Sequence, residues 1–209
     1  MASIYQLKPA FQNLLRPLVE KLAKMGVTAN QVTLFALLLS AALGAAIVIA
    51  PQSQWPLWCV PFLLFVRMAL NAIDGMLARE HSMQSDLGAI LNELGDVLAD
   101  TALYLPFALL AGLDPAAVIL VCVLAIISEM TGVIGVQIGA SRRYDGPMGK
   151  SDRAFIFGVI ALLLASGWGN FAWLNGGLWV VVGLLAITVI NRARQALCEK
   201  QALLGQQGL

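Results

Sequence analysis

Six apolar stretches, separated by short polar links, follow one another from residue 32 onward. Most of them approach the ~20 residues that an α-helix needs to cross the hydrocarbon core of a bilayer. The fifth stretch is short, and the second, third and fourth are interrupted by charged residues. The pattern predicts an all-α integral membrane protein with six transmembrane helices. The stretches cover residues 32–50, 56–79, 86–111, 116–140, 154–168 and 173–191.

Residues 4–25 have a different pattern, in which apolar side chains recur every three or four positions and basic side chains fill the other side. This predicts an N-terminal amphipathic helix that lies in the membrane interface, with a helix that docks on a partner as the alternative. Pro9 and Pro17 lead us to expect that this helix is broken or starts late. Thr28 or Asn30 can cap the helix that follows. We divide the chain into a cytoplasmic or interfacial arm (1–31), a membrane domain (32–195) and a cytoplasmic tail (196–209).

Composition and charge distribution agree with this arrangement. Hydrophobic residues make up 59% of the chain and charged residues only 12%, against about 25% charged residues in a soluble domain. Of the thirteen lysines and arginines, all but Arg67 fall on one side of a six-span arrangement, which predicts that both termini are cytoplasmic. The first apolar stretch begins too late for a cleavable signal peptide, so we expect it to act as an uncleaved anchor. A compact chain without a transit peptide suggests a bacterial inner membrane, with lipids rather than nucleic acid as partners.

Acidic and amide side chains gather on the second and third predicted helices, which a short polar link joins into a hairpin. Ionisable groups at membrane depth are costly and usually face a cavity, a partner or an ion. Carboxylates that face each other repel unless a positive charge lies between them, and Mg²⁺ or Mn²⁺ favours such oxygen ligands. The hairpin therefore predicts a divalent metal site. The two stripes contain Asn71 and Asp74 on the first helix and Asn92, Glu93, Asp96 and Asp100 on the second.

Depth in the membrane separates these residues into two groups. From the helical rise of ~1.5 Å per residue, Asp74 and Asp96 lie near the cytoplasmic ends of their helices, where they can meet a water-soluble substrate. Arg67, Asp100 and Glu129 lie deeper and share a level. We expect Arg67 to pair with Asp100 or Glu129, because an unpaired charge at that depth would cost several kcal/mol.

The link between the fourth and fifth stretches, SRRYDGPMGKSDR, is rich in basic residues. The positive-inside bias accounts for their sign. Beside an acidic metal site, Arg142, Arg143 and Lys150 would also suit an anionic substrate such as a phosphate. We therefore predict that these three residues bind a phosphate-bearing acceptor.

The spacing of the hairpin residues resembles the signature of the CDP-alcohol phosphatidyltransferase family, D-x2-D-G-x2-A-R-x8-G-x3-D-x3-D. Every other fixed position of that signature is matched without a gap, but the first and third aspartates are replaced by Asn71 and Asn92. The segment VTANQVT, the six-span layout and the basic fourth link are also similar to the family. The matching positions are Asp74, Gly75, Ala78, Arg79, Gly88 and Asp96.

Membership implies transfer of a phosphoryl-linked alcohol from a CDP-alcohol to an acceptor alcohol, with release of CMP and a requirement for Mg²⁺ or Mn²⁺. By motif position, Asp96 would be the general base and Asp74 a metal ligand. The resemblance also implies a homodimer. It places the CDP moiety around Gly75, Ala78, Arg79 and Gly88.

The two asparagines remove two negative charges from a site that the resemblance predicts to hold two divalent ions. Asparagine can still ligate through its amide oxygen, but more weakly. Three outcomes are open: a rebuilt two-metal site, a one-metal enzyme, or a protein that binds nucleotide without turnover. We favour a rebuilt site in which Glu93 and Asp100 restore the number of carboxylates.

The sequence thus predicts a membrane phosphotransferase of phospholipid synthesis. We expect CDP-diacylglycerol as donor and a phosphorylated polyol, such as glycerol phosphate or inositol phosphate, as acceptor. The alternatives are a non-catalytic CDP-lipid-binding protein, which only the two asparagines favour, and a cation transporter that uses the same carboxylates.

Overall fold

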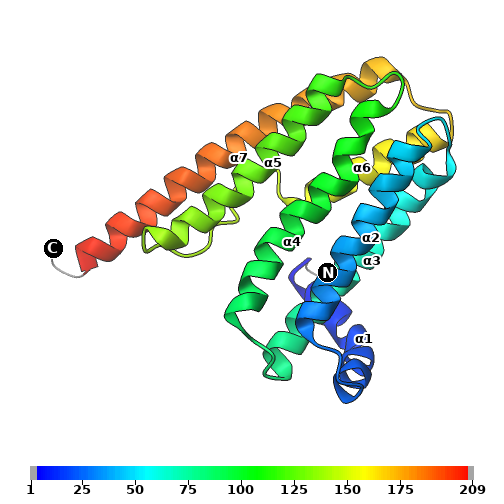
Figure 1. Ribbon diagram of the computed structural model, residues 1–209. Coiled ribbons are helices and arrows are strands. Elements are labelled where there is room, and N and C mark those ends of the chain that lie inside the picture. The colour runs from blue at the N-terminus through cyan, green and yellow to red at the C-terminus, as the bar shows by residue number, and fades with distance from the viewer. Residues whose placement is uncertain (1–3, 207–209) are drawn as a thin grey trace.

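The computed structural model describes residues 4–206, and all regular structure in this range is helical (Figure 1). Each predicted apolar stretch overlaps one of the helices α2 to α7, which confirms the all-α fold. In chain order the elements are α1 (Ile4–Lys24), α2 (Ala29–Ile49), α3 (Trp55–Glu80), α4 (Asp86–Tyr104), the 3-10 helix η1 (Leu105–Leu109), α5 (Pro115–Gln137), α6 (Lys150–Ala165) and α7 (Phe171–Gln206).

Four of these helices, α2, α3, α5 and α7, are long and apolar enough to cross a membrane. Helix α4 carries four acidic residues along its 19 positions, and α6 has only 16 residues. The charges of α4 and the shortness of α6 explain why neither is counted among the helices that are long and apolar enough to cross a membrane. The integral membrane character of the protein therefore rests on four helices, and the count of six spans stays a prediction.

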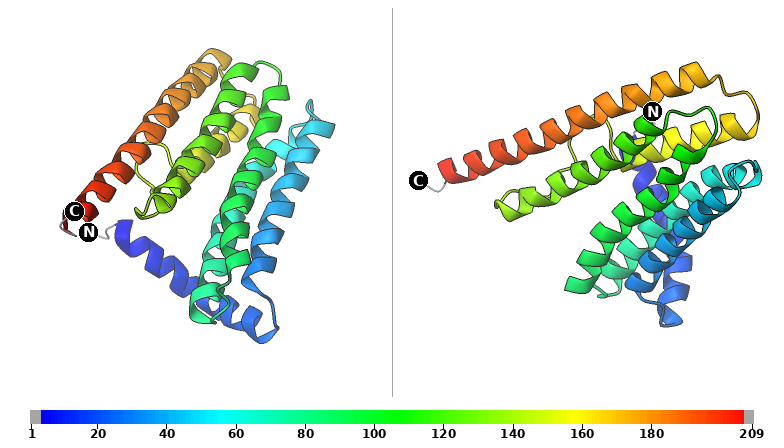
Figure 2. Two further views of the ribbon diagram at one scale, coloured as in Figure 1. Left: turned by 60° about the vertical axis from the view of Figure 1, so that its left-hand side comes forward. Right: turned by 45° about the horizontal axis from the view of Figure 1, so that its top comes forward.

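Helices α2 to α7 run roughly alongside one another (Figures 1 and 2). Helix α2 packs against α3 and α4, α3 packs against α6, and α5 packs against α7. The contact between α2 and α4 is close at Gly44, where a Cβ atom would lie 1.9 Å from the carbonyl oxygen of Ala102. Small residues allow helices to approach in this way inside membranes.

The largest hydrophobic core lies where α3, α4, η1 and α6 meet α5 and α7. The rings of Tyr104 and Phe157 stack with centroids 4.1 Å apart, and Phe107 meets Phe157 edge-on at 5.2 Å. All three aromatic side chains are buried. This packing fixes the position of α4 relative to α6. Both helices carry residues of the candidate site described below.

Helix α1 lies across the bundle at the end where α2 begins (Figure 2, left). It runs without a break from Ile4 to Lys24 although both prolines lie inside it, so the expected interruption was wrong. Pro9 and Pro17 are exposed, where water can bind the carbonyls that lose their partners. Arg16 pairs with Glu80 at 2.9 Å and joins α1 to the end of α3. An interfacial position for α1 stays a prediction.

Two element boundaries differ from the predicted stretches. The third stretch is not one helix: α4 ends at Tyr104 and continues as η1, because Pro106 cannot supply the backbone N–H that an α-helix requires. The predicted boundary between membrane domain and tail, at residue 195, falls inside α7. Ala196 is buried, so α7 continues past this boundary as packed structure. Thr28 caps α2 through a reciprocal pair of bonds with Gln31, as one of the two predicted candidates.

Candidate active site

Helices α3 and α4 bring the two polar stripes together, as the hairpin predicts. Asp74 on α3 is only 5% exposed, and its Oδ2 accepts a hydrogen bond of 2.8 Å from the Thr33 hydroxyl on α2. The Asn71 amide on α3 donates to Oδ1 of Asp96 on α4 at 3.5 Å. The same oxygen of Asp96 forms an ion pair with Lys150 at the start of α6. Residues from four helices therefore converge on these carboxylates.

A first cleft, of about 570 Å³, opens between α2, α3 and the start of α4. Two of its walls are backbone rather than side chain, at Gly75 and Gly88. A Cβ atom at Gly88 would lie 2.9 Å from Oδ1 of Asn30, and one at Gly75 would lie 3.0 Å from the Arg79 guanidinium, so a larger residue at either position would displace one of these polar side chains. Asp74 and Asn92 line the same cleft, as do all the residues predicted to surround CDP: Gly75, Ala78, Arg79 and Gly88.

A second cleft, of about 280 Å³, lies beside the first and shares Asn92 with it. Its charged groups come from five segments of the chain: α4, α5, the link after α5, α6 and α7. Positive and negative side chains are equal in number. The positive ones are Arg142, Lys150, Arg153 and Arg192, and the negative ones are Glu93, Asp96, Glu129 and Asp152.

The predicted acceptor residues divide between the cleft and the outside of the bundle. Arg142 and Lys150 line the second cleft, but Arg143 does not. Arg143 binds Asp145 at 2.8 Å and Glu199 of α7 at 2.6 Å, and its guanidinium holds the pKa of the Asp145 carboxyl below its usual range. The structure thus places Arg143 outside the second cleft, toward the end of α7, whereas its neighbour Arg142 lines the cleft.

A third cavity, of about 520 Å³, runs between α3 and α6. Its walls are mostly apolar, with aromatic and aliphatic side chains such as Phe65, Met68 and Phe155. The polar residues of its lining include Asn71, Arg67 and Lys150. The three cavities thus meet around a small polar junction: Asn71 borders the third, Asn92 the first and second, and Lys150 the second and third.

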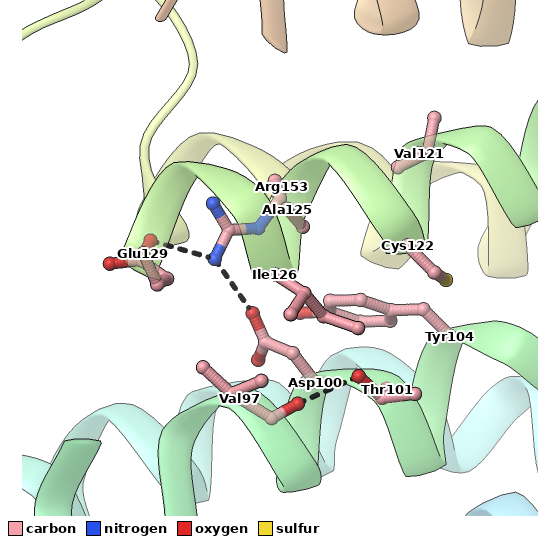
Figure 3. A pocket seen from close by; sticks show the side chains of 10 residues that line it. All are labelled: Val97, Asp100, Thr101, Tyr104, Val121, Cys122, Ala125, Ile126, Glu129 and Arg153. Carbon is pink, nitrogen blue, oxygen red and sulfur yellow. Dashed lines mark hydrogen bonds and ion pairs between the residues drawn. The ribbon is translucent and has the colours of Figure 1, made fainter. Parts of the chain in front are cut away.

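A largely buried network of ion pairs adjoins this junction, and Figure 3 shows the part of it formed by Asp100, Arg153 and Glu129. Asp100 binds Arg67 through one carboxylate oxygen at 2.9 Å and Arg153 through the other at 3.0 Å. Arg153 also reaches Glu129 at 3.2 Å. The predicted pair of Arg67 with Asp100 is confirmed. Glu129, the alternative partner, binds Arg142, Arg153 and Arg192 instead.

Glu93 and Asp100 are not available to rebuild a two-metal site in this arrangement. Both oxygens of Glu93 accept hydrogen bonds of 2.9 Å from Arg142, and both oxygens of Asp100 are bound by arginines. Within residues 4–206, no three acidic, histidine or cysteine side chains are grouped so that they could hold one ion. The oxygen ligands that arginine leaves available for a divalent ion are the carboxylates of Asp74 and Asp96 and the amide oxygens of Asn71 and Asn92.

Sequence reasoning missed several residues of the site. Arg192 belongs to the last helix, and its position gave no local signal. Arg153 follows Lys150 by three residues, a spacing that places both on one face of a helix, so helical periodicity could have found it. Asn30 and Thr33 also line the first cleft, but Asn30 was considered only as a helix cap and Thr33 was given no role.

The sequence profile described as CDP-alcohol phosphatidyltransferase matches residues 26–191. The chain belongs to the CDP-alcohol phosphatidyltransferase family. The matched range begins just before α2 and ends inside α7, so it contains the junction and every residue that lines the three cavities except Arg192.

Relatives and solved structures extend this family assignment. The chain is 48% identical over 196 residues to the Escherichia coli inner membrane protein YnbA, covering 93% of this chain and 96% of YnbA. It is 36% identical over 103 residues to an uncharacterized protein of Aquifex aeolicus, about half of each chain. The fold is similar to Mycobacterium tuberculosis phosphatidylinositol phosphate synthase PgsA1 with CDP-DAG bound, with a TM-score of 0.73, 18% identity and coverage of 86% of this chain and 92% of that one. A second PgsA1 structure, in complex with manganese and citrate, matches with a TM-score of 0.70 at 18% identity, over 86% and 87% of the two chains.

Proposed function

We propose that this protein transfers a phosphatidyl group from a CDP-alcohol, CDP-diacylglycerol, to an acceptor alcohol and releases CMP. The observation that carries the proposal is the meeting of three cavities of different chemistry around Asn71, Asn92, Asp96 and Lys150. A CDP-lipid has a nucleotide, an apolar tail and a reacting diphosphate between them. The acceptor requires a third, polar compartment.

The donor would occupy the first and third cavities. The first cleft carries the family positions Gly75, Ala78, Arg79 and Gly88, and its open backbone walls suit a flat nucleotide. The Arg79 guanidinium can meet a phosphate oxygen. The third cavity is apolar along α3 and α6 and suits acyl chains that enter from the bilayer. The CDP-DAG complex of PgsA1, a protein of similar fold, supports a CDP-lipid as the donor.

A divalent ion, Mg²⁺ or Mn²⁺, would be held by Asp74 with the help of the Asn71 and Asn92 amide oxygens. When bound, such an ion neutralises the diphosphate and stabilises the leaving CMP. The protein's own part is to fix these oxygens: Thr33 orients Asp74 through its 2.8 Å hydrogen bond. The manganese complex of PgsA1 supports a metal-dependent reaction.

Asp96 would act as the general base. Its Oδ1 accepts from Lys150 and Asn71, whereas its Oδ2 has no hydrogen-bond partner within residues 4–206. The free oxygen can take the proton of the acceptor hydroxyl as that oxygen attacks the phosphorus that bears diacylglycerol. One P–O bond forms to the acceptor, and the P–O bond to CMP breaks.

The acceptor would enter the second cleft, where Arg142 and Lys150 favour a phosphorylated polyol such as glycerol phosphate or inositol phosphate. The balance of charges in this cleft favours a second candidate. Since four carboxylates already neutralise the four cations, an uncharged polyol would bind through its hydroxyls without separating any ion pair.

We also propose the arrangement in the membrane. The basic residues of the α1 arm, of the link after α5 and of the end of α7 lie on one side of a six-span arrangement, with both termini cytoplasmic. The family resemblance supports a homodimer. A bacterial inner membrane fits the relative YnbA, which is an inner membrane protein.

CMP release by the purified protein in detergent tests the function. With CDP-diacylglycerol, Mn²⁺ and a pool of alcohols, we expect release that stops on chelation of the metal and resumes when it is restored. Splitting the pool into phosphorylated and uncharged polyols then separates the two acceptor candidates. Saturable CDP-lipid binding without CMP release would favour a non-catalytic protein, and cation flux without nucleotide would favour a transporter.

A change at Arg142 should affect the acceptor and not the donor. Arg142→Gln removes the guanidinium that Glu93 and Glu129 share, and we expect the KM for the acceptor to rise about 10- to 100-fold, as for loss of 1–3 kcal/mol of binding. The KM for the donor should stay within twofold. Arg143→Gln is the matched control, because Arg143 is the next residue and points outside the cleft. Equal effects of the two changes would contradict the placement of the acceptor.

A further inference from the structure

Lys150 has an unusual position for a cation beside a metal site. Its Nζ forms an ion pair with Oδ1 of Asp96, the same oxygen that accepts from the Asn71 amide, and both charged side chains are 30% exposed. The ammonium lies on the border between the second and third cavities. It is thus next to the place where the donor diphosphate and the acceptor would meet.

The fold fixes this lysine by its backbone. Lys150 is the first residue of α6, and the preceding Gly149 N–H donates to Oδ2 of Asp152 at 2.8 Å. One residue earlier, the Met148 N–H donates to the Thr188 hydroxyl of α7 at 3.0 Å, and the Met148 side chain is buried. One hydrogen bond within the first turn of α6 and one to α7 therefore fix the start of α6. They hold the backbone of Lys150 beside the junction.

The formal charges at the junction indicate the role of the Lys150 ammonium. The four motif positions hold two aspartates and two asparagines, a formal charge of −2, and Lys150 neutralises one of these charges. Glu93 and Asp100 add nothing, since arginines bind both of their oxygens. One carboxylate, Asp74, remains to be balanced by a metal.

We infer that the ammonium of Lys150 replaces a second divalent cation, so that the site takes one metal ion, at Asp74, and a fixed lysine at Asp96. This inference rests on the proposed function, because it concerns the same site. The ammonium supplies a positive charge and N–H donors toward the donor diphosphate, without needing the two carboxylates that the asparagines have replaced. Its pairing with Oδ1 also leaves Oδ2 of Asp96 turned to the acceptor.

The number of bound ions tests the inference directly. Mn²⁺ binding to the purified protein with CDP present should give one ion per chain, with the electron paramagnetic resonance spectrum of an isolated ion. Two spin-coupled ions, or none, would overturn it. The triple variant N71D/N92D/K150M should bind two coupled ions, and a count of one in that variant would overturn the replacement of a metal by Lys150.

The affinity for CDP in the presence of Mn²⁺ tests the lysine itself. We expect Lys150→Met to weaken CDP binding at least tenfold in the natural background and less than threefold in the N71D/N92D background, where a second ion supplies the charge. Lys150→Arg should retain affinity within threefold, and Lys24→Met, an exposed lysine on α1, is the control. An equal loss in both backgrounds would overturn the inference. Neither measurement needs turnover, so a protein that fails to release CMP but binds one ion refutes the proposed function alone.

Discussion

Replacing Asp96 by asparagine is expected to lower the rate of CMP release about 10²- to 10⁴-fold, the contribution typical of a positioned general base. Asparagine keeps the shape of the side chain and can still accept from Asn71, but its amide cannot take up the acceptor proton. The rate should be measured with saturating CDP-diacylglycerol, acceptor and Mn²⁺. Binding of one Mn²⁺ and of CDP should persist, because the ion is proposed to lie at Asp74.

Asp145→Asn is the matched control for this change. Asp145 lies in the link after α5, where its carboxylate binds Arg143 outside the three cavities. The rate of CMP release should stay within twofold of the unchanged protein. Retention of more than a tenth of the activity by Asp96→Asn would mean that another group accepts the proton.

Much of the site could be predicted because its signals are local. Gly75, Ala78 and Arg79 are fixed relative to Asp74 by one helix, and a short link sets the antiparallel partner that carries Gly88 and Asp96. The chain needed only to form two helices and a hairpin to bring all but Asp96 to one cleft and Asp96 to the adjoining one. The helical stretches follow from hydropathy for the same reason.

The partners of Glu93 and Asp100 could not be predicted in this way. Periodicity placed both carboxylates on the acidic face of α4, and their number suggested a rebuilt metal site. It could not show that Arg142 comes back from the link after α5, or that Arg153 projects from α6 to Asp100. Such pairings depend on how distant helices pack, which local sequence does not encode.

The pair of Arg67 with Asp100 could be predicted because an unpaired charge at that depth in the membrane is costly, whatever the local sequence pattern. A single arginine within an apolar span must find a carboxylate at its own level, and only two acidic groups share that level. Asp100 supplies one oxygen to Arg67 and leaves the second for Arg153. Asp100 therefore has a structural role at the base of the site, and its removal gives a second large effect.

Asp100→Asn is expected to lower the free energy of unfolding by about 3–5 kcal/mol, the usual cost of removing one partner from a buried ion pair. Arg67 and Arg153 are 3% and 2% exposed, so water cannot replace the lost carboxylate. Unfolding in mixed micelles with increasing denaturing detergent measures the change, with Asp145→Asn as the exposed control, expected within about 0.5 kcal/mol.

The double variant R67M/D100L separates the lost pair from a loss of packing. It removes both the carboxylate and one of its arginines, while Arg153 keeps its bond to Glu129. We expect it to be more stable than Asp100→Asn by more than 1 kcal/mol, since an uncompensated buried charge costs more than an apolar replacement of the pair. Asp100→Asn and R67M/D100L should each still bind one Mn²⁺ under conditions in which they are folded. Loss of the ion in Asp100→Asn without any loss of stability would instead make Asp100 a metal ligand, and the buried network would then have to open when metal binds.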